Sequence, residues 1–325
     1  MPLVVVDARD AVLEPLRGWG RYVRELVDHL APPDLEVRAL TAGGRGPEVL
    51  FEQVGLPRLL RRTGADLVHA PNCFLPLRRP CPGVVTIHDL AFEALPEDFS
   101  RRTGTKYRVI TRRAARSAQR VICVSRWTAD DVVRRYGVDP EKVRVVPNAP
   151  SLPVGDAPLP AAGPYVLAVG DLRPKKNLVR LVEAWRRAAT GHRLVLAGAG
   201  AWPQGAPPDG VELTGYVDDA RLDALMRGAD LLVHPSLYEG FGLVVVEAMA
   251  RGVPVACADA TALPETAGGA AVLFDPLDED AIAGAIRRAL ADRERLATAG
   301  RARAAEFSWQ RTAELTAEVY REALA

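Results

Sequence analysis

The chain has 325 residues, and 42 Lys and Arg against 41 Asp and Glu leave a formal net charge of +1. Apolar residues make up 48% of the chain, which suffices for a packed core and excludes global disorder. A domain usually holds about 100–200 residues, so we expect two domains. The near-zero net charge argues against a nucleic-acid partner, because such proteins carry a basic footprint.

Four cysteines, Cys73, Cys81, Cys123 and Cys257, do not form a disulfide framework, and the absence of CxxC leaves a zinc ribbon unsupported. The first apolar run, Leu3–Val6, is too short for a signal peptide and follows no basic segment. No stretch approaches the ~18 apolar residues of a membrane span. We therefore expect a reduced, cytoplasmic protein.

Short apolar runs alternate with amphipathic segments along the first half of the chain. They predict a helix at Gly20–Leu30 and strands at Leu3–Val6, Val37–Leu40, Leu67–His69, Val84–His88 and Val121–Val124. Apolar runs without alternation suit strands covered on both faces, as in a parallel sheet. Residues 149–164 contain five prolines and two glycines, which disfavour both helix and central strand. They predict an interdomain linker over 151–163.

The alternation restarts after this linker. Strands are predicted at Tyr165–Val169, Arg193–Ala197, Val211–Leu213, Leu231–Val233, Val253–Cys257 and Ala271–Leu273. Helices are predicted at Leu178–Ala188, Ala220–Arg227, Val244–Arg251, Glu279–Leu290, Asp292–Arg303 and Trp309–Leu324, the last capped by Ser308. Two successive blocks of this kind predict an α/β fold with two Rossmann-like domains and a ligand site in the interdomain cleft.

The stretch from His234 to Ala250 reads as a strand end, a glycine loop and a helix start. Glu239 and Glu247 are separated by seven residues, and Gly240 and Gly242 follow the first glutamate. Glycines permit close backbone approach, and the N–H groups of a first helical turn attract phosphate. Carboxylates on either side can accept hydrogen bonds from sugar hydroxyls, so this stretch predicts a sugar-nucleotide site.

A second group of candidate residues, Arg173, Lys175 and Lys176, follows the strand predicted at Tyr165–Val169. Fixed cations in this position can neutralise a phosphate-bearing leaving group, which otherwise needs a metal ion. The one Asp-x-Asp, at 278–280, fits a helix start better than a metal site. The cations are therefore expected to act without a metal ion, and no cofactor is required.

The stretch containing Glu239 and Glu247 resembles the Glu-x7-Glu motif of GT-B, family 4-like retaining glycosyltransferases. The similarity continues through 121–125, 136–148, 252–255, 263–268, 274–278 and 307–309, and so covers nearly the whole chain. It implies a GT-B fold with an acceptor-side domain at 1–150 and a nucleotide-sugar domain at 164–306. It further implies that a C-terminal helix within 307–325 packs back on the N-terminal domain.

The resemblance also implies catalytic roles. Lys176 matches the family's phosphate-binding lysine, and we expect Arg173 to replace an arginine that the family often has at Asp171. Glu239 is expected to orient the transferred sugar. His88, at the end of a predicted strand, matches a family histidine beside that sugar.

Further positions are implied to bind the nucleotide sugar. The N–H groups of Phe241, Gly242 and Leu243, next to Gly240, are expected at the diphosphate, and Glu247 at the ribose. The turn at Tyr216 and Val217 matches one that lies against the base. Gly18 and Gly20 match a loop near the phosphates and the acceptor.

The run from Leu263 to Ala271, with Lys176-Asn177, looks most like members that use GDP-mannose, and UDP-sugars are the alternative. The acceptor is expected to be a glycan, a lipid-linked or a small molecule, as in polysaccharide biosynthesis. A catalytically silent partner subunit is a second alternative, because Asp171 and Ala149 depart from the family pattern. A dehydrogenase is disfavoured, because Gly18-Trp-Gly20 lacks the third glycine of a dinucleotide fingerprint.

Residues 101–120 carry eight cations and no acid. We favour a solvated helix whose cations pair with acids elsewhere in the chain. The alternative is a surface for anionic lipid or a phosphate-bearing acceptor, which would give weak peripheral contact at the inner face of the membrane.

Overall fold

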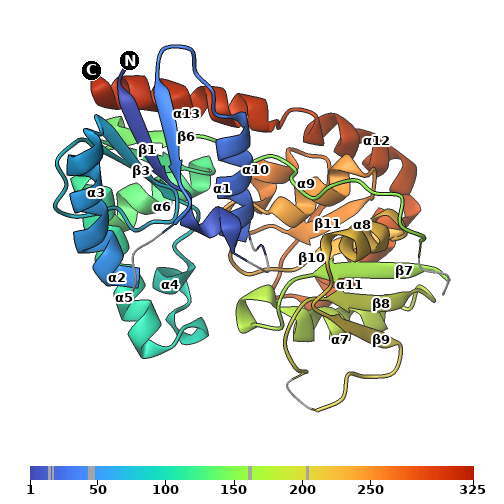
Figure 1. The fold of residues 1–325 in the computed structure, drawn as a ribbon. Helices are drawn as coiled ribbons and strands as arrows, with labels where there is room; N and C mark the ends of the chain where they lie inside the picture. The colour runs from blue at the N-terminus through green and yellow to red at the C-terminus, as the bar shows by residue number, and fades with distance from the viewer. Residues whose placement is uncertain (14–15, 17, 43–47, 160–162, 203–204) are drawn as a thin grey trace. The chain divides into compact units, whose positions relative to one another are not determined.

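The computed structural model describes residues 1–13, 16, 18–42, 48–159, 163–202 and 205–325. The chain divides into two compact units. Unit 1 combines residues 1–151 with residues 307–325, and unit 2 comprises residues 152–306. Each unit is built around one parallel sheet with surrounding helices (Figure 1).

The unit 1 sheet has the strand order β2-β1-β3-β4-β5-β6. Its strands are β1 (Leu3–Asp7), β2 (Glu36–Leu40), β3 (Leu67–Ala70), β4 (Gly83–Ile87), β5 (Arg120–Cys123) and β6 (Val143–Val145). Its helices are α1 (Gly18–His29), α2 (Glu48–Leu50), α3 (Leu56–Thr63), α4 (Ala91–Ala94), α5 (Arg101–Ser117), α6 (Arg126–Tyr136) and α13 (Trp309–Leu324). Successive β1 residues enter different cores, Val5 with Leu60 of α3 and Val4 with Tyr22 of α1. This burial on both faces explains the unbroken apolar run of β1.

The last helix, α13, belongs to unit 1, as the family resemblance implied. The Ser308 side chain caps it as predicted by accepting the N–H of Arg311. Trp309 donates Nε1–H to the carbonyl of Pro150 at 3.0 Å. Near the other end, the Tyr320 hydroxyl lies 2.7 Å from Nδ1 of His69 in β3.

The unit 2 sheet has the order β12-β11-β10-β7-β8-β9. Its strands are β7 (Tyr165–Val169), β8 (Arg193–Ala197), β9 (Val211–Gly215), β10 (Leu231–His234), β11 (Val255–Ala258) and β12 (Val272–Phe274). Its helices are α7 (Leu178–Ala188), α8 (Asp219–Arg227), α9 (Leu243–Ala250), α10 (Leu263–Ala267), α11 (Glu279–Ala291) and α12 (Arg293–Ala304). This is the doubly wound order, which reverses direction between β7 and β10. Ligands of such sheets bind beyond the carboxyl ends of the strands at this switch point.

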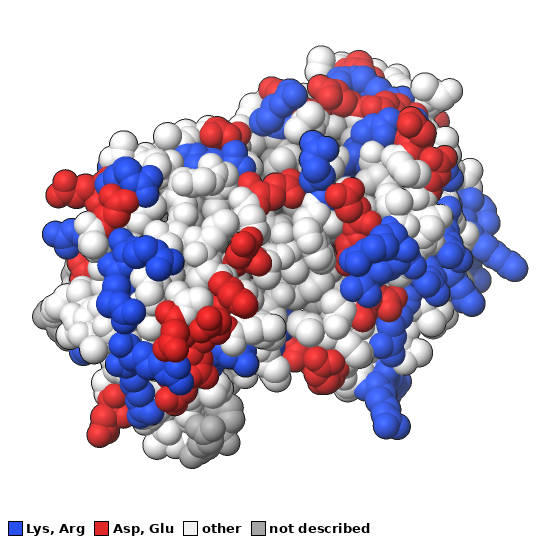
Figure 2. Space-filling model, turned by 180° about the vertical axis from the view of Figure 1, so that it is seen from behind, with Lys and Arg blue, Asp and Glu red and all other residues white. Residues whose placement is uncertain are grey.

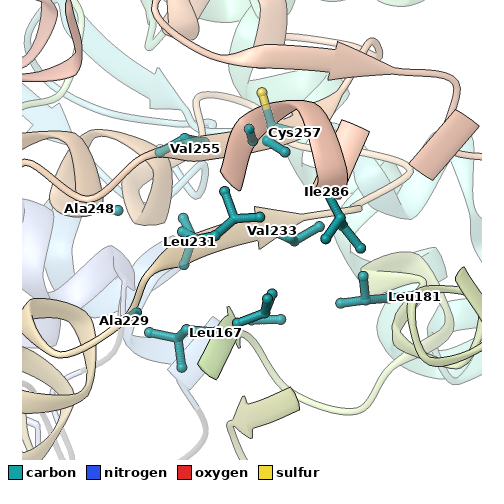
Figure 3. Packing of buried hydrophobic residues seen from close by; sticks show 14 of the residues in the cluster. Leu167, Leu181, Ala229, Leu231, Val233, Ala248, Val255, Cys257 and Ile286 are labelled. Carbon is teal, nitrogen blue, oxygen red and sulfur yellow. The ribbon is translucent and has the colours of Figure 1, made fainter. Parts of the chain in front are cut away.

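The unit 2 core lies around the central strands (Figure 3). Leu167 of β7, Val233 of β10 and Cys257 of β11 are fully or almost fully buried. Leu181 of α7 and Ile286 of α11 belong to the same cluster. This packing fixes the two strands from which the candidate site is built.

Some boundaries differ from the sequence-based predictions. β11 begins at Val255 instead of Val253, after Pro254, which has no N–H to give to a strand ladder. α1 begins at Gly18, two residues before the predicted start. Within the proline-rich segment, Leu152 and Gly155 donate their N–H groups to Glu247 and Asp223 of unit 2, whereas the Pro150 carbonyl belongs to unit 1 and accepts from Trp309.

The basic segment 101–120 forms α5 and the start of β5. Lys106 pairs with Glu48 at 3.3 Å, and Arg120 pairs with Glu322 at 2.9 Å. Arg112 and Arg116 donate to backbone carbonyls. Pairing with acids therefore holds for Lys106 and Arg120, and it stays a prediction for the rest of the segment.

Acidic and basic side chains are interspersed over much of the visible face in Figure 2, and basic ones gather in parts of it. Among the helices in the described ranges, none combines the length and hydropathy that crossing a membrane requires.

Candidate active site

Lys176 and Glu239 meet at the switch point of the unit 2 sheet. Lys176 ends a short 3-10 turn, Pro174–Lys176, that follows β7, and Glu239 lies in the loop that follows β10. Lys176 donates to Glu239 Oε1 from Nζ at 2.5 Å. Two residues predicted from separate motifs, 63 positions apart, are therefore brought into contact.

His234, the last residue of β10, holds the same carboxylate oxygen. Its Nε2 lies 3.0 Å from Glu239 Oε1. Burial lowers the pKa of His234, so the ring is neutral and Nε2 carries the hydrogen that Glu239 accepts. Sequence reasoning did not assign His234 a role, although its place between strand and glycine loop was a usable signal.

Glu239 is ionised in this setting. Burial alone would raise its pKa, but the Lys176 charge and the His234 hydrogen bond outweigh burial and hold the pKa well below its ordinary value. The Thr261 hydroxyl accepts the backbone N–H of Glu239 at 3.0 Å. Backbone and side chain of Glu239 are thus both fixed.

The turn carrying Lys176 is tied to the loop carrying Glu239. Asn177 donates Nδ2–H to the carbonyls of Pro235 and Pro276 at 3.2 and 2.7 Å. A Cβ at Gly170, where φ is +153°, would lie 3.1 Å from two carbons of the Lys176 side chain. Glycine at this position therefore lets the lysine stem lie against the backbone.

The glycine loop leads directly into α9. Gly242 caps the helix with φ +97°, and a Cβ there would lie 2.7 Å from Leu263. The buried Thr266 hydroxyl donates to the Phe241 carbonyl. No acidic residue lies in the first turn of α9, all of which is described. The N–H of Val245 bonds to the Gly242 carbonyl at 2.9 Å, and first-turn N–H groups without such an intrahelical acceptor can serve an anion. With Gly240 and Leu243, this loop has the geometry that suits an anion.

Glu247 lies on α9 in a buried ion-pair network. Its Oε1 accepts the N–H of Leu152 at 2.7 Å, and its Oε2 accepts from Arg251 at 3.0 Å. Arg251 also pairs with the buried Asp223 at 2.8 Å. The sequence did not indicate this structural role of Glu247.

Arg173, Tyr216 and Val217 are the other residues of unit 2 that the sequence predicted for the site. Arg173 precedes the 3-10 turn that ends at Lys176 and is partly buried. Tyr216 and Val217 follow β9, the edge strand two positions from β7 in the sheet. Tyr216 is 56% exposed, so its ring is available for stacking. Within the described ranges, no group of three or more His, Cys, Asp or Glu side chains could hold a metal ion.

In unit 1, His88 follows β4 directly and is buried. Its Nε2 lies 2.7 Å from the Pro71 carbonyl, which only accepts, so Nε2 carries the hydrogen. Burial lowers the pKa of His88, so the ring is neutral and Nδ1 is an acceptor. The Trp19 ring stacks on the His88 ring with 5.8 Å between ring centroids, and the Tyr22 ring meets it edge-on with 4.6 Å between centroids.

Gly18 and Gly20 both lie in the first turn of α1. A Cβ at Gly20 would lie 2.4 Å from the Asp10 carbonyl, whereas one at Gly18 would meet open space. Glycine is therefore needed at position 20 for packing, because α1 closely approaches the 3-10 turn Arg9–Val12 there.

Comparison with known proteins agrees with this architecture. Residues 156–305 match the family model for glycosyl transferases group 1, and residues 45–150 match the model for glycosyltransferase family 4. O-antigen chain mannosyltransferase B of Escherichia coli is 29% identical over 98% of this chain and 99% of that protein. The MMP alpha-(1->4)-mannosyltransferase of Mycolicibacterium hassiacum is 33% identical over 90% of this chain and 79% of that protein.

Among solved structures, sucrose-phosphate synthase from Thermosynechococcus elongatus superimposes with a TM-score of 0.76. It is 24% identical, and the match covers 98% of each chain. This likeness concerns the fold, which is the expected GT-B arrangement of two Rossmann-like domains. By its two family matches and its relatives, the chain belongs to the family 4-like glycosyltransferases.

Proposed function

We propose that this glycosyltransferase moves mannose from GDP-mannose to a glycan, lipid-linked or small-molecule acceptor, with retention and without a metal ion. The contact between Lys176 and Glu239 at the unit 2 switch point carries this proposal. Two mannosyltransferase relatives support mannose as the sugar. A UDP-sugar is the alternative donor substrate.

The charged groups divide the work on the donor substrate. Lys176 and Arg173 stabilise the departing diphosphate, with the N–H groups of Phe241–Leu243. When the diphosphate binds, Lys176 pairs with it instead of with Glu239. The ionised Glu239 then accepts hydrogen bonds from the hydroxyls of the transferred sugar. His234 keeps Glu239 in place during this exchange.

The remaining predicted residues bind the other parts of the substrate. His88 accepts a hydrogen bond from a hydroxyl of the reacting sugar through Nδ1. Glu247 orients the ribose, and Tyr216 and Val217 lie against the base. Gly18 and Gly20 form the start of α1 near the phosphates and the acceptor.

Retention follows from attack on the face of the sugar that the diphosphate leaves. The bond from the anomeric carbon to the phosphate oxygen breaks, and a bond to the acceptor oxygen forms. The acceptor hydroxyl proton passes to the departing phosphate oxygen. No covalent sugar–enzyme intermediate is needed.

Thermal unfolding with GDP, UDP, ADP or dTDP and their sugars, without added metal, tests the nucleotide assignment. A ligand at ~100 times its Kd adds about 2.7 kcal/mol to the free energy of unfolding. A GDP-selective shift that Lys176→Ala abolishes supports the proposal. A shift that is selective for UDP or dTDP would assign a UDP- or dTDP-sugar as the donor instead of GDP-mannose. No shift with any nucleotide would favour the alternative of a catalytically silent partner subunit.

Nuclear magnetic resonance of the first product formed from GDP-α-mannose tests the stereochemistry. An α-linked product is expected, and a β-linked product would reject retention. Turnover that persists in excess chelator supports a metal-independent reaction, whereas loss of turnover that Mg²⁺ restores contradicts it.

A further inference from the structure

An open cavity lies on the surface of unit 1, away from the residues assigned to sugar transfer. Its volume is 440 Å³, and its lining consists of Arg61, Leu77, Arg78, Arg79, Cys81 and Ser117. These residues come from the end of α3, the β3–β4 connection and the end of α5, and each segment precedes a strand. The cavity therefore lies at the amino ends of the strands, whereas His88 follows the carboxyl end of β4.

The lining is cationic. Three of its six residues are arginines, and none is acidic. The side chains of Arg61 and Arg78 are exposed and make no hydrogen bond or ion pair with any residue in the described ranges. Burial and, to a smaller extent, the nearby Asp66 carboxylate raise the pKa of the Cys81 thiol to about 11. Asp66 already has a partner, because it accepts the N–H of Leu3 at 2.7 Å.

Arg79 is anchored without a counter-ion among the described residues. It donates to the Pro76 carbonyl at 2.9 Å, to the Ser117 hydroxyl at 3.3 Å and to the Ser117 carbonyl. All three acceptors are neutral, and burial lowers the pKa of Arg79. A partly buried guanidinium that has no carboxylate partner is stabilised when a ligand supplies an anion beside it.

We propose that this cavity binds a phosphate group. Arg61 and Arg78 donate to its oxygens in the forked geometry that matches guanidinium to phosphate, and Arg79 supplies a fixed charge. A water molecule occupies about 30 Å³ in the liquid, so a cavity of 440 Å³ has room for a phosphate group. The phosphate belongs to a soluble phosphorylated molecule or to a lipid headgroup, and the two sources can be separated by experiment.

Cys81 provides a local reporter. It lines the cavity and is partly exposed, whereas Cys73, Cys123 and Cys257 are buried. The rate at which neutral N-ethylmaleimide labels Cys81, followed by mass spectrometry, should fall when the cavity is filled. Inorganic pyrophosphate at ten times its Kd should slow labelling about 11-fold.

Matched variants assign this protection to the cavity. Arg61→Ala and Arg78→Ala should each remove most of it. Arg62→Ala, a change of the neighbouring arginine on α3 that does not line the cavity, should retain it. Lys176→Ala should retain it as well, which separates this site from pyrophosphate bound at the proposed transfer site.

Vesicles identify the source of the phosphate. Protection by pyrophosphate but not by phosphatidylglycerol–phosphatidylcholine vesicles indicates a soluble ligand. Protection by these vesicles but not by pure phosphatidylcholine indicates a headgroup, provided that Arg61→Ala abolishes it. Protection by neither probe, or protection unchanged in both Arg61→Ala and Arg78→Ala, would overturn the proposal.

Discussion

Lys176 is the residue whose charge the proposed reaction needs most. Its ammonium lies 2.5 Å from Glu239 Oε1, and Arg173 directly precedes the 3-10 turn that ends at Lys176. Lys176→Ala should lower kcat by about 10²–10³, the loss that follows removal of one preorganised charge-stabilising donor. Steady-state kinetics with the nucleotide sugar that stabilises the protein measures the effect. Lys142→Ala, in unit 1, is the control, and wild-type turnover in Lys176→Ala would refute the assignment.

His234 is a positioning residue for Glu239, and its effect should appear in the pH dependence. His234→Leu removes one hydrogen bond that helps to hold the pKa of Glu239 low, so the pKa of this carboxyl should rise. In the proposed reaction, Glu239 must be ionised to accept hydrogen bonds from the sugar. The acid limb of kcat/KM should therefore move to higher pH.

His234→Gln restores an N–H at this position and is the conservative comparison. It should return the acid limb toward that of the wild type. A uniform loss of activity at all pH values in His234→Leu would instead indicate a purely structural role.

At the scale of elements, α9 both carries the glycine loop and anchors the segment that begins unit 2. The Arg251 side chain, 1% exposed, joins Glu247 and Asp223 and donates to the carbonyls of Leu152 and Pro153. Arg251→Ala leaves two buried carboxylates without this partner. It should lower the free energy of unfolding by about 3–5 kcal/mol, measured by urea unfolding.

Arg293→Ala is the matched control for this network. Arg293 is 60% exposed and lies 3.6 Å from Asp230, so its loss should cost less than about 1 kcal/mol. Equal losses in the two variants would contradict the importance assigned to the buried network. The result also matters for Glu247, whose effect on nucleotide binding must be measured on folded protein.

The sequence predicted those elements whose signal is local. The bounds of α7, α13, β7 and β8 agree with prediction because an apolar run or a periodic face defines each of them. The Arg251 network could not be predicted, because Leu152 and Glu247 are 95 positions apart. For the same reason, the sequence could not show that Glu247, expected at the ribose, also accepts hydrogen bonds from Leu152 and Arg251.

At the scale of the whole chain, the sequence predicted two Rossmann-like domains but no strand order. The switch point between β7 and β10 emerges from the order of pairing. Once that order is known, the contact between the residues that follow these two strands is a consequence of topology. The family resemblance supplied the roles expected of Lys176 and Glu239, and the fold brings the two side chains into contact.

Buried histidines in both units link the stability of the chain to pH. Burial lowers the pKa of His69 to about 3, and it also lowers the pKa values of His88 and His234. In the unfolded chain each ring has a pKa near ~6.5. As the pH falls below that value, the unfolded state binds protons that the folded state does not, so the free energy of unfolding decreases.

His69 allows this effect to be isolated. Its ring lies between Thr86 and Tyr320, at 2.8 and 2.7 Å, so His69→Gln keeps polar atoms for both partners and removes the titration. Between pH 7 and pH 5 the wild type should lose about 2 kcal/mol more than His69→Gln in urea unfolding. His29→Gln, an exposed control, should keep the wild-type dependence. The same loss in His69→Gln would mean that His69 takes up its proton in the folded state, which its two hydrogen bonds inside the core of unit 1 argue against.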